Sequence, residues 1–269
     1  MTENTDTGAL LRSLYAPTGG VAKIFSSKVE DYVASRPDYP TSLYDALRRV
    51  ANLDAESLIA DIGAGTGLLT QGFLQRGYAV VAVEPNAEMR QAADHILQAF
   101  PKYHSLSGSA ESIPLEATSV DLITAAHAFH WFKVEEARAE CLRVLRPAGT
   151  VALIWNERLL SDPLHVALDD ILAQFGGEKR AALVAHEERG DIPTFFGATT
   201  SEQMTWQHEH TLSQAGLLSL VFSRSYMPER TSSAGQEVSQ RVQEVFQSHA
   251  RTGSVSVRYT TVLIVGRPR

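Results

Sequence analysis

The stretch that decides the fold is Ala60-Asp61-Ile62-Gly63-Ala64-Gly65-Thr66-Gly67-Leu68. The apolar residues 57–60 predict a strand that leads into this turn, and residues 68–74 predict the first turns of a helix. A strand, a glycine-rich turn and a helix together bring main-chain atoms against a nucleotide-like ligand, because glycine has no Cβ and tolerates positive φ. The candidate binding residues of the turn are therefore Gly63, Ala64, Gly65, Thr66 and Gly67.

The spacing of the glycines narrows the choice of ligand. The dinucleotide fingerprint is G-x-G-x-x-G, but the order here is G-x-G-x-G, and Leu68 stands where the third glycine of the fingerprint would fall. A phosphate loop needs Lys followed by Ser or Thr after its last glycine, and neither follows Gly67.

An acidic residue ends the next predicted strand, residues 79–84. Glu84 follows Gly63 by about 20 residues, the separation at which an acid can accept hydrogen bonds from both hydroxyls of a bound ribose. Pro85 and Asn86 then begin a helix, with Asn86 as its N-cap. The alternative for Glu84 is a surface acid that caps this helix.

The composition predicts one soluble α/β domain. The chain has 269 residues, 44% of them apolar, and a formal charge of −7. Nucleic-acid binding depends on neutralising phosphates with Lys and Arg, so we expect no nucleic-acid partner. Cys141 is the only cysteine, which excludes an internal disulfide and predicts a buried, inert thiol. The polar N-terminus lacks a signal-peptide pattern, and no apolar run approaches the ~20 residues that span a bilayer; we expect a cytoplasmic protein without stable membrane association.

Several ordered motifs over about residues 22–156 resemble the class I S-adenosylmethionine (SAM) methyltransferases. Asp61 stands where that family has an acid before its G-x-G-x-G turn. Residues 108–115, G-S-A-E-S-I-P-L, resemble the G-D-A-E-x-L-P-F motif of the type 11 and ubiquinone-menaquinone-biosynthesis-like branch, which methylates small molecules. Residues 127–132, H-A-F-H-W-F, resemble the fourth motif of the same branch.

The resemblance implies an α/β fold: a seven-stranded Rossmann-like sheet of order 3-2-1-4-5-7-6, its last strand antiparallel, with helices on both faces. The alternation of predicted strands and helices up to residue 156 independently indicates a parallel sheet. We expect a mobile N-terminus over residues 1–20 and a single methyltransferase domain over 21–269. Its expected parts are N-terminal lid helices (21–52), a SAM-binding core (53–156), an acceptor-side cap insertion after strand five (157–202) and C-terminal strands and helices (203–269).

The resemblance also implies cofactor contacts. The pattern Phe25…Tyr32…Arg36-Pro37-x-Tyr39-Pro40 matches a segment that folds over the cofactor, which places Tyr32 and Arg36 at the methionine end of SAM. At the adenine end, the main-chain amide of Ala110 carries over, whereas Ser109 replaces the family's acid or amide. The remaining candidates are Glu111, which alternatively caps the following turn, Pro85 beside Glu84, and Met89, which alternatively fills the core.

The predicted fourth strand, residues 119–126, ends at two candidate general bases. Ligands bind at the carboxyl ends of strands in an open α/β sheet, so the carbonyl of Ala126 and the side chain of His127 should face the sulfonium or the methyl acceptor. His127 and His130 are candidate bases; the alternative is that both imidazoles are packed and bonded to backbone. Nothing nearby adds ligands with zinc-like spacing, so we expect no metal site.

The primary functional hypothesis is methyl transfer from SAM to an oxygen, nitrogen or carbon of a small-molecule acceptor, by in-line displacement in a covered pocket, with S-adenosylhomocysteine (SAH) as product. The protein would be a monomer or a homodimer. One alternative is a non-catalytic SAM- or SAH-binding sensor or partner subunit. Another is an NAD-dependent oxidoreductase, against which Leu68 argues. Phe195 and Phe196 either line the acceptor pocket or anchor the insertion.

Overall fold

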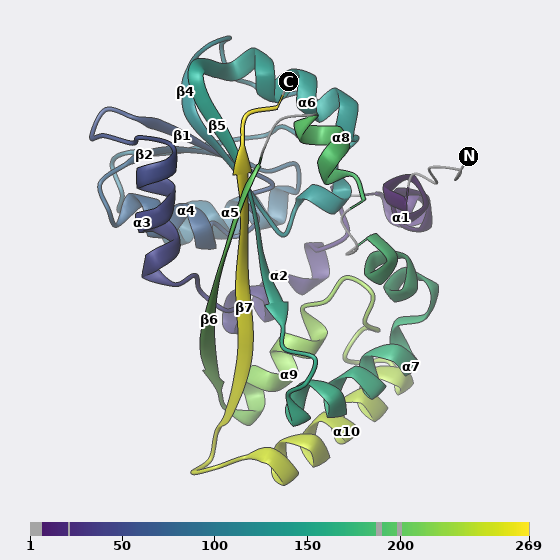
Figure 1. Cartoon of the computed structure of the whole chain (residues 1–269). Helices are drawn as coiled ribbons and strands as arrows, with labels where there is room; N and C mark the ends of the chain where they lie inside the picture. Colours follow the sequence, from purple (N-terminus) through teal and green to yellow (C-terminus); the bar gives the residue numbers. More distant parts are fainter. Residues whose placement is uncertain (1–6, 21, 187–189, 198–200, 269) are drawn as a thin grey trace.

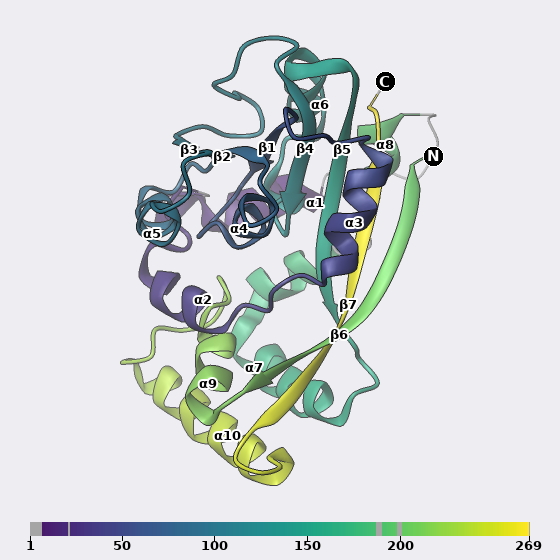
Figure 2. The ribbon, with the colours of Figure 1, turned by 90° about the vertical axis from the view of Figure 1, so that its left-hand side faces the viewer.

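The computed structural model describes residues 7–20, 22–186, 190–197 and 201–268, which contain a mixed seven-stranded sheet (Figure 1). The strand order is β3-β2-β1-β4-β5-β7-β6, visible edge to edge in Figure 2. β7 runs antiparallel to β5 and to β6, whereas the other pairs are parallel. The predicted order and the antiparallel last strand are confirmed. The strands are β1 Leu58–Ile62, β2 Ala79–Val83, β3 Tyr103–Leu106, β4 Val120–Ala126, β5 Leu145–Arg158, β6 Glu202–Leu212 and β7 Val255–Gly266.

Helices cover both faces of the sheet because its central strands are apolar on both sides. Alternate residues of one strand belong to opposite cores: Val151 and Leu153 of β5 to one, Ala152 and Ile154 to the other. The first core includes buried residues of α1 (Thr7–Tyr15), α6 (Val134–Val144) and α8 (Ile192–Phe196). The second includes buried residues of α3 (Thr41–Val50), α4 (Leu68–Leu74) and α5 (Ala87–Leu97).

The C-terminal half adds a third apolar core beyond the carboxyl ends of the parallel strands. There α7 (Pro163–His186), α9 (Gln214–Phe222) and α10 (Ser233–His249) pack on the part of the antiparallel β6–β7 pair that extends past the rest of the sheet (Figure 1). Buried residues of β7 such as Val257 and Tyr259 belong to this core. The sheet therefore carries helices both on its faces and below its carboxyl edge, and a pocket can form between the two sets.

The expectation of a mobile N-terminus over residues 1–20 is wrong for residues 7–20. α1 and the 3-10 turn Ala16–Thr18 pack on the domain, with Leu11 and Tyr15 fully buried. The Tyr15 hydroxyl donates to Ser225 Oγ at 2.8 Å, and its ring meets Trp131 edge-on at 5.3 Å between centroids. Packing against these partners, which lie far away in the sequence, orders the short apolar stretch. Residues 1–6 lie outside the described residues.

The predicted lid helices over residues 21–52 separate into two groups with different roles. The turn Ser26–Lys28 and α2 (Val29–Ser35) pack near the third core. In contrast, α3 buries Leu43, Tyr44 and Leu47 in the second core. The assignment of α3 to a lid is therefore wrong, because its apolar face is used against the sheet. We call residues 22–40 the lid segment from here on.

Candidate active site

The glycine turn connects β1 to α4 at the carboxyl edge of the sheet. Gly63, Gly65 and Gly67 all have positive φ, at 69°, 58° and 82°. A Cβ on Gly63 would come 2.6 Å from Ala128 Cβ, and one on Gly67 would come 2.6 Å from Leu97 Cδ1. A Cβ on Gly65 would have no heavy atom within 4 Å. Two of the glycines thus allow close packing inside the protein, whereas Gly65 faces open space where a ligand can reach the main chain.

Glu84 lies directly against this turn. Its Oε2 accepts the Gly65 N–H at 2.9 Å, and its Oε1 accepts the Asn86 N–H at 2.8 Å. The side chain is 8% exposed, and this burial raises its pKa above the usual value for Glu. Each carboxylate oxygen has a second lone pair, so two further hydroxyl donors can be accepted without breaking the contacts to the turn. The structure therefore brings together the two features that the sequence predicted to share one ligand.

Asp61 lies beneath the turn and is 1% exposed. Its carboxylate oxygens accept from the hydroxyls of Thr70 at 2.7 Å and Thr124 at 2.8 Å. Burial raises the pKa of Asp61 to about 6, although both hydroxyl bonds act in the opposite direction. Because burial disfavours the ionised form of this carboxyl group, a nearby cation would stabilise its negative charge.

Most residues predicted at the adenine end are buried or bonded to other parts of the protein. The Glu111 carboxylate accepts the main-chain N–H of Lys133 at 2.8 Å, which favours the alternative of a structural cap. Met89 is 2% exposed, which favours its alternative as a core residue. Ser109 pairs with Ser112 in an isolated β-bridge, and Ala110 is buried. Pro85 is half-buried between Glu84 and the start of α5.

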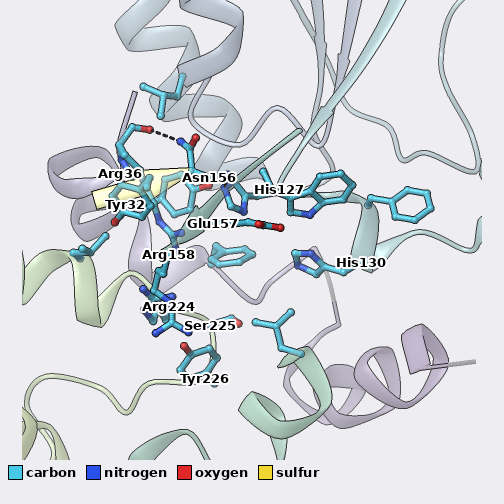
Figure 3. Close-up of a pocket in the computed structure, with 18 of the residues that line it drawn as sticks. Tyr32, Arg36, His127, His130, Asn156, Glu157, Arg158, Arg224, Ser225 and Tyr226 are labelled. Carbon is cyan, nitrogen blue, oxygen red and sulfur yellow. Dashed lines mark hydrogen bonds between the residues drawn. The ribbon is translucent and has the colours of Figure 1, made fainter. Parts of the chain in front are cut away.

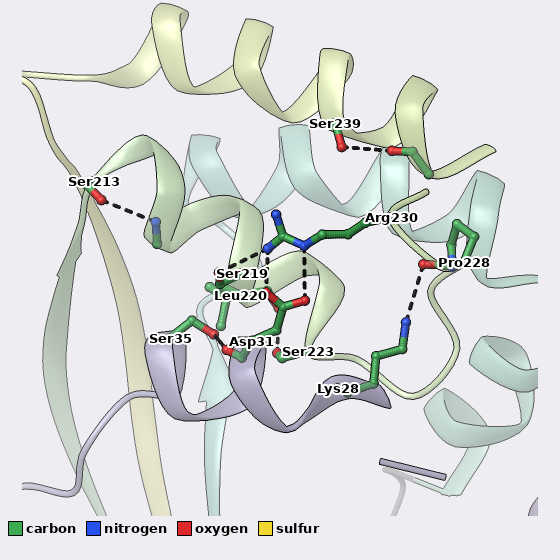
Figure 4. A network of polar contacts seen from close by, with 12 residues as sticks. Lys28, Asp31, Ser35, Ser213, Ser219, Leu220, Ser223, Pro228, Arg230 and Ser239 are labelled. Atoms are coloured by element: carbon green, nitrogen blue, oxygen red, sulfur yellow. Dashed lines mark hydrogen bonds and ion pairs between the residues drawn. The ribbon is translucent and has the colours of Figure 1, made fainter. Parts of the chain in front are cut away.

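The lid segment is attached on both sides of the carboxyl edge. On the core side, the Asn86 side-chain amide donates to the Ala22 carbonyl at 2.9 Å. On the other side, α2 is joined to the chain around α9 (Figure 4). The buried Lys28 ammonium donates to the carbonyls of Met227 and Pro228, and the Arg230 guanidinium pairs with Asp31. The lid segment therefore bridges the core around the glycine turn and the C-terminal helices.

A pocket of about 310 Å³ lies between these parts, at the carboxyl ends of β4 and β5 (Figure 3). Tyr32 and Arg36 enter it from the lid segment, and the Arg36 guanidinium stacks over the Tyr32 ring at 4.4 Å. Arg36 Nη2 also donates to the Ser223 carbonyl at 3.1 Å. Leu68 lines the pocket as the first residue after the glycine turn, so the pocket adjoins the predicted cofactor site. Its aromatic lining residues include Phe25, Phe129, Trp131 and Trp155.

His127 reaches the pocket, but the structure argues against its predicted role as a general base. It adopts the left-handed conformation with φ 51°, directly after Ala126 at the end of β4. Its Nε2 accepts the main-chain N–H of Asn156 at 2.8 Å. A neutral imidazole has one accepting nitrogen, so this bond occupies the lone pair that a base needs. His130 also lines the pocket, and its ring lies tilted beside that of Trp131 at 4.7 Å between centroids.

Asn156, which the sequence did not single out, connects the pocket to the lid segment. Its amide Nδ2 contacts the carbonyls of Pro37 at 3.4 Å and Asp38 at 3.3 Å, one of which is drawn in Figure 3. Its Oδ1 accepts the Thr261 hydroxyl at 2.7 Å. The available signal was its position at the carboxyl end of a central strand, where polar residues face ligands.

The predicted cap insertion, residues 157–202, supplies part of the pocket wall. Phe195 and Phe196 are almost fully buried, and Phe195 packs edge-on against Phe129 at 5.3 Å. They anchor the insertion and do not line the pocket. The described part of residues 157–202 contributes Glu157, Arg158, Leu160 and Leu183 to the pocket wall. Arg224, Ser225 and Tyr226 after α9 supply further polar wall.

Within the described ranges, no group of three or more His, Cys, Asp and Glu side chains could hold a metal ion. Cys141 is buried in the first core, and burial raises its pKa to about 12, as expected for an inert thiol.

No helix in the described part of the chain combines the length and the apolar character needed to cross a membrane.

Comparison with known proteins decides the family. A methyltransferase-domain model matches residues 60–153. An uncharacterised methyltransferase of Mycobacterium tuberculosis is 33% identical over 243 residues, which cover 89% of this chain and 93% of the relative. This chain belongs to the methyltransferase family. The predicted methyltransferase family is thereby confirmed, in preference to a nicotinamide oxidoreductase.

Two further similarities agree with this membership. A protein of Saccharomyces cerevisiae named as a SAM-dependent methyltransferase is 26% identical over 216 residues, covering 66% of this methyltransferase and 73% of the yeast protein. Among solved structures, a protein of Anaeromyxobacter dehalogenans described as a type II methyltransferase has a TM-score of 0.61 and 22% identity, covering 87% of this chain and 99% of that one. The structural likeness supports the fold alone. Membership of the family implies SAM as methyl donor.

Proposed function

We propose that this methyltransferase binds SAM across the glycine turn and transfers its methyl group to a small organic acceptor in the adjoining pocket. The observation that carries the proposal is the contact between Glu84 and Gly65 beside an open main-chain surface. Glu84 would accept both ribose hydroxyls, and the open face of Gly65 would admit the nucleoside.

The methionine half of SAM would extend from the turn toward the lid segment. Arg36 is suited to its carboxylate, because the guanidinium already stands in the pocket and its Nε has no hydrogen-bond partner among the described residues. The buried carboxylate of Asp61 lies under the same turn and would favour the ammonium group. Tyr32 and Trp131 border the pocket as aromatic surfaces that attract a sulfonium.

When bound, SAM supplies a methyl group that its sulfonium already activates. The task of the protein is then to align the acceptor and to exclude water. The lid segment and the aromatic residues that line the pocket are suited to that task, because they enclose the pocket between the core and the C-terminal helices. His127 would hold the end of β5 through Asn156, and His130 remains the candidate for a base if the acceptor atom carries a proton.

Calorimetric titration tests the cofactor proposal. SAH should bind the purified 269-residue protein at one site, and NADH should not produce a saturable signal in the same buffer. A turnover screen with methyl-labelled SAM against small organic molecules then tests transfer. A well-folded protein that binds neither SAM nor SAH would contradict the proposal.

A further inference from the structure

One end of the pocket is built from side chains that donate hydrogen bonds. Arg158 ends β5, Arg224 follows α9, and Tyr259 lies in β7, and all three line the pocket. Figure 3 shows Arg158 and Arg224 close together, on the side of the pocket where Ser225 and Tyr226 lie. Three elements that are distant in sequence therefore direct their donors toward the same region.

The Tyr259 hydroxyl indicates that this region receives a ligand. Tyr259 is 4% exposed, and its hydroxyl has no hydrogen-bond partner in the part of the chain that the structure describes. Its ring is fixed, stacked on His208 at 5.6 Å and edge-on to His165 at 5.7 Å between centroids. A buried hydroxyl that is fixed in place and unpaired is rare unless another molecule completes it.

The charge around that hydroxyl is positive. Burial raises the pKa of Tyr259, whereas the charges of Arg224, Arg36 and Arg158 each lower it, so all three guanidiniums lie within electrostatic reach of the hydroxyl. Of the acidic residues, Glu157 lines the pocket. Asp169 accepts from Arg158 at 3.0 Å, but Arg180 shares the same carboxylate at 2.7 and 2.8 Å. A cationic pocket in a chain with a net charge of −7 points to an anionic ligand.

We propose that the methyl acceptor is an organic acid whose carboxylate binds Arg158, Arg224 and the Tyr259 hydroxyl. A planar guanidinium matches a carboxylate in two parallel hydrogen bonds, and the hydroxyl adds a third donor. A single negative charge suits the site because Glu157 lies in the same pocket. The apolar body of the acid would lie along Trp155 and Leu183, toward Trp131. This inference rests on the proposed function and specifies its substrate class.

The test uses the 269-residue protein saturated with SAH, so that the donor site is already filled. The probes are two matched pairs, phenylacetate with phenylacetamide and cinnamate with cinnamamide, together with phenyl phosphate. Binding is followed by ligand-observed NMR titration. Both acids should bind at least about tenfold more tightly than their amides, since a hydrogen bond to a charged group is worth that much.

Tyr259→Phe is the decisive variant, because it removes a hydroxyl that no described protein group holds. Its melting temperature should be unchanged or raised, while its affinity for the acids falls about tenfold and its affinity for SAH stays within about twofold of wild type. Arg224→Gln should weaken acid binding by at least as much. Arg48→Gln, which removes an exposed charge from α3, should leave all three measurements unchanged.

Three results would overturn the proposal. The first is that the acids bind no better than their amides. The second is that phenyl phosphate binds while both acids do not. The third is that Tyr259→Phe weakens SAH binding as strongly as acid binding, which would assign these donors to the carboxylate of SAM. Failure of SAH to bind the wild-type protein is a separate outcome, and it would overturn the proposed function as well as the substrate class that depends on it.

Discussion

Replacing Glu84 by alanine separates two roles that the structure gives to one carboxylate. In the protein alone, the oxygens accept main-chain N–H groups of Gly65 and Asn86 at 2.9 and 2.8 Å. In the proposed complex, the remaining lone pairs accept the two ribose hydroxyls. The variant therefore affects both the free energy of unfolding and the affinity for the donor, and the two effects can be measured independently.

The expected magnitudes follow from the number of hydrogen bonds. Two buried N–H groups lose their acceptor, at about 1–3 kcal/mol each, but the cost of burying the carboxylate disappears, so we expect a net loss of about 1–3 kcal/mol in unfolding free energy. Two ribose bonds to a charged acceptor, at about 1.5 kcal/mol each, give about 3 kcal/mol of binding. That loss raises the Kd for SAH by about 150-fold.

The assay is calorimetric titration of SAH and of adenosine, with chemical unfolding of each variant as a measure of stability. Adenosine contains the ribose but not the methionine half, so its affinity isolates the contact to Glu84. Glu84→Gln should fall between wild type and Glu84→Ala, and Glu56→Ala, an exposed acid before β1, is the matched control. The ribose assignment is refuted if folded Glu84→Ala binds SAH within about threefold of wild type.

Three further predictions concern the edge of the sheet. Gly65→Ala should cost about 1–2 kcal/mol of stability, because φ is 58°, and should weaken SAH binding by more than about tenfold; calorimetry that shows wild-type affinity would contradict ligand contact at this main-chain position. His127→Ala should lower the unfolding free energy by about 1–3 kcal/mol, because the Asn156 N–H loses its acceptor, and equal stability in urea would disprove this role. The pKa of Asp61 is about 6 in the folded protein, against an ordinary value of 3.8. Its contribution to the free energy of unfolding is therefore fully present below pH 3.8 and is lost as pH rises through 6, a fall of about 3 kcal/mol. Unfolding curves of Asp61→Asn between pH 4 and 7.5 should lack this fall.

The fold was predictable because the sequence patterns that indicate its strands are local and recur along the chain. Apolar runs predicted the strands at 79–84 and 119–126 to within one residue of the observed β2 and β4. The cofactor side was predictable for a related reason. The glycine turn and Glu84 each follow a strand, and parallel strands bring their carboxyl ends to one edge.

The N-terminal helix and the acceptor side were not predictable in the same way. The helix containing Leu11 and Tyr15 is ordered by Trp131 and Ser225, and no local pattern announces a partner more than a hundred residues away. The same holds for the proposed acid site, whose Arg158, Arg224 and Tyr259 come from separate elements. Their convergence depends on how the C-terminal helices pack against the antiparallel β6–β7 pair.

His127 shows why residue type and position do not suffice to assign a chemical role. A histidine at the end of β4 has the location that favours a base, yet the left-handed backbone turns its Nε2 toward the Asn156 N–H. Asn156 in turn contacts the lid segment at Pro37 and Asp38. The imidazole therefore helps to set the position of the strand end that holds the lid segment. The organic acid proposed as substrate fits this arrangement, because its carboxylate is already ionised at neutral pH and binding it calls for donors such as Arg158 and Tyr259 rather than for a base.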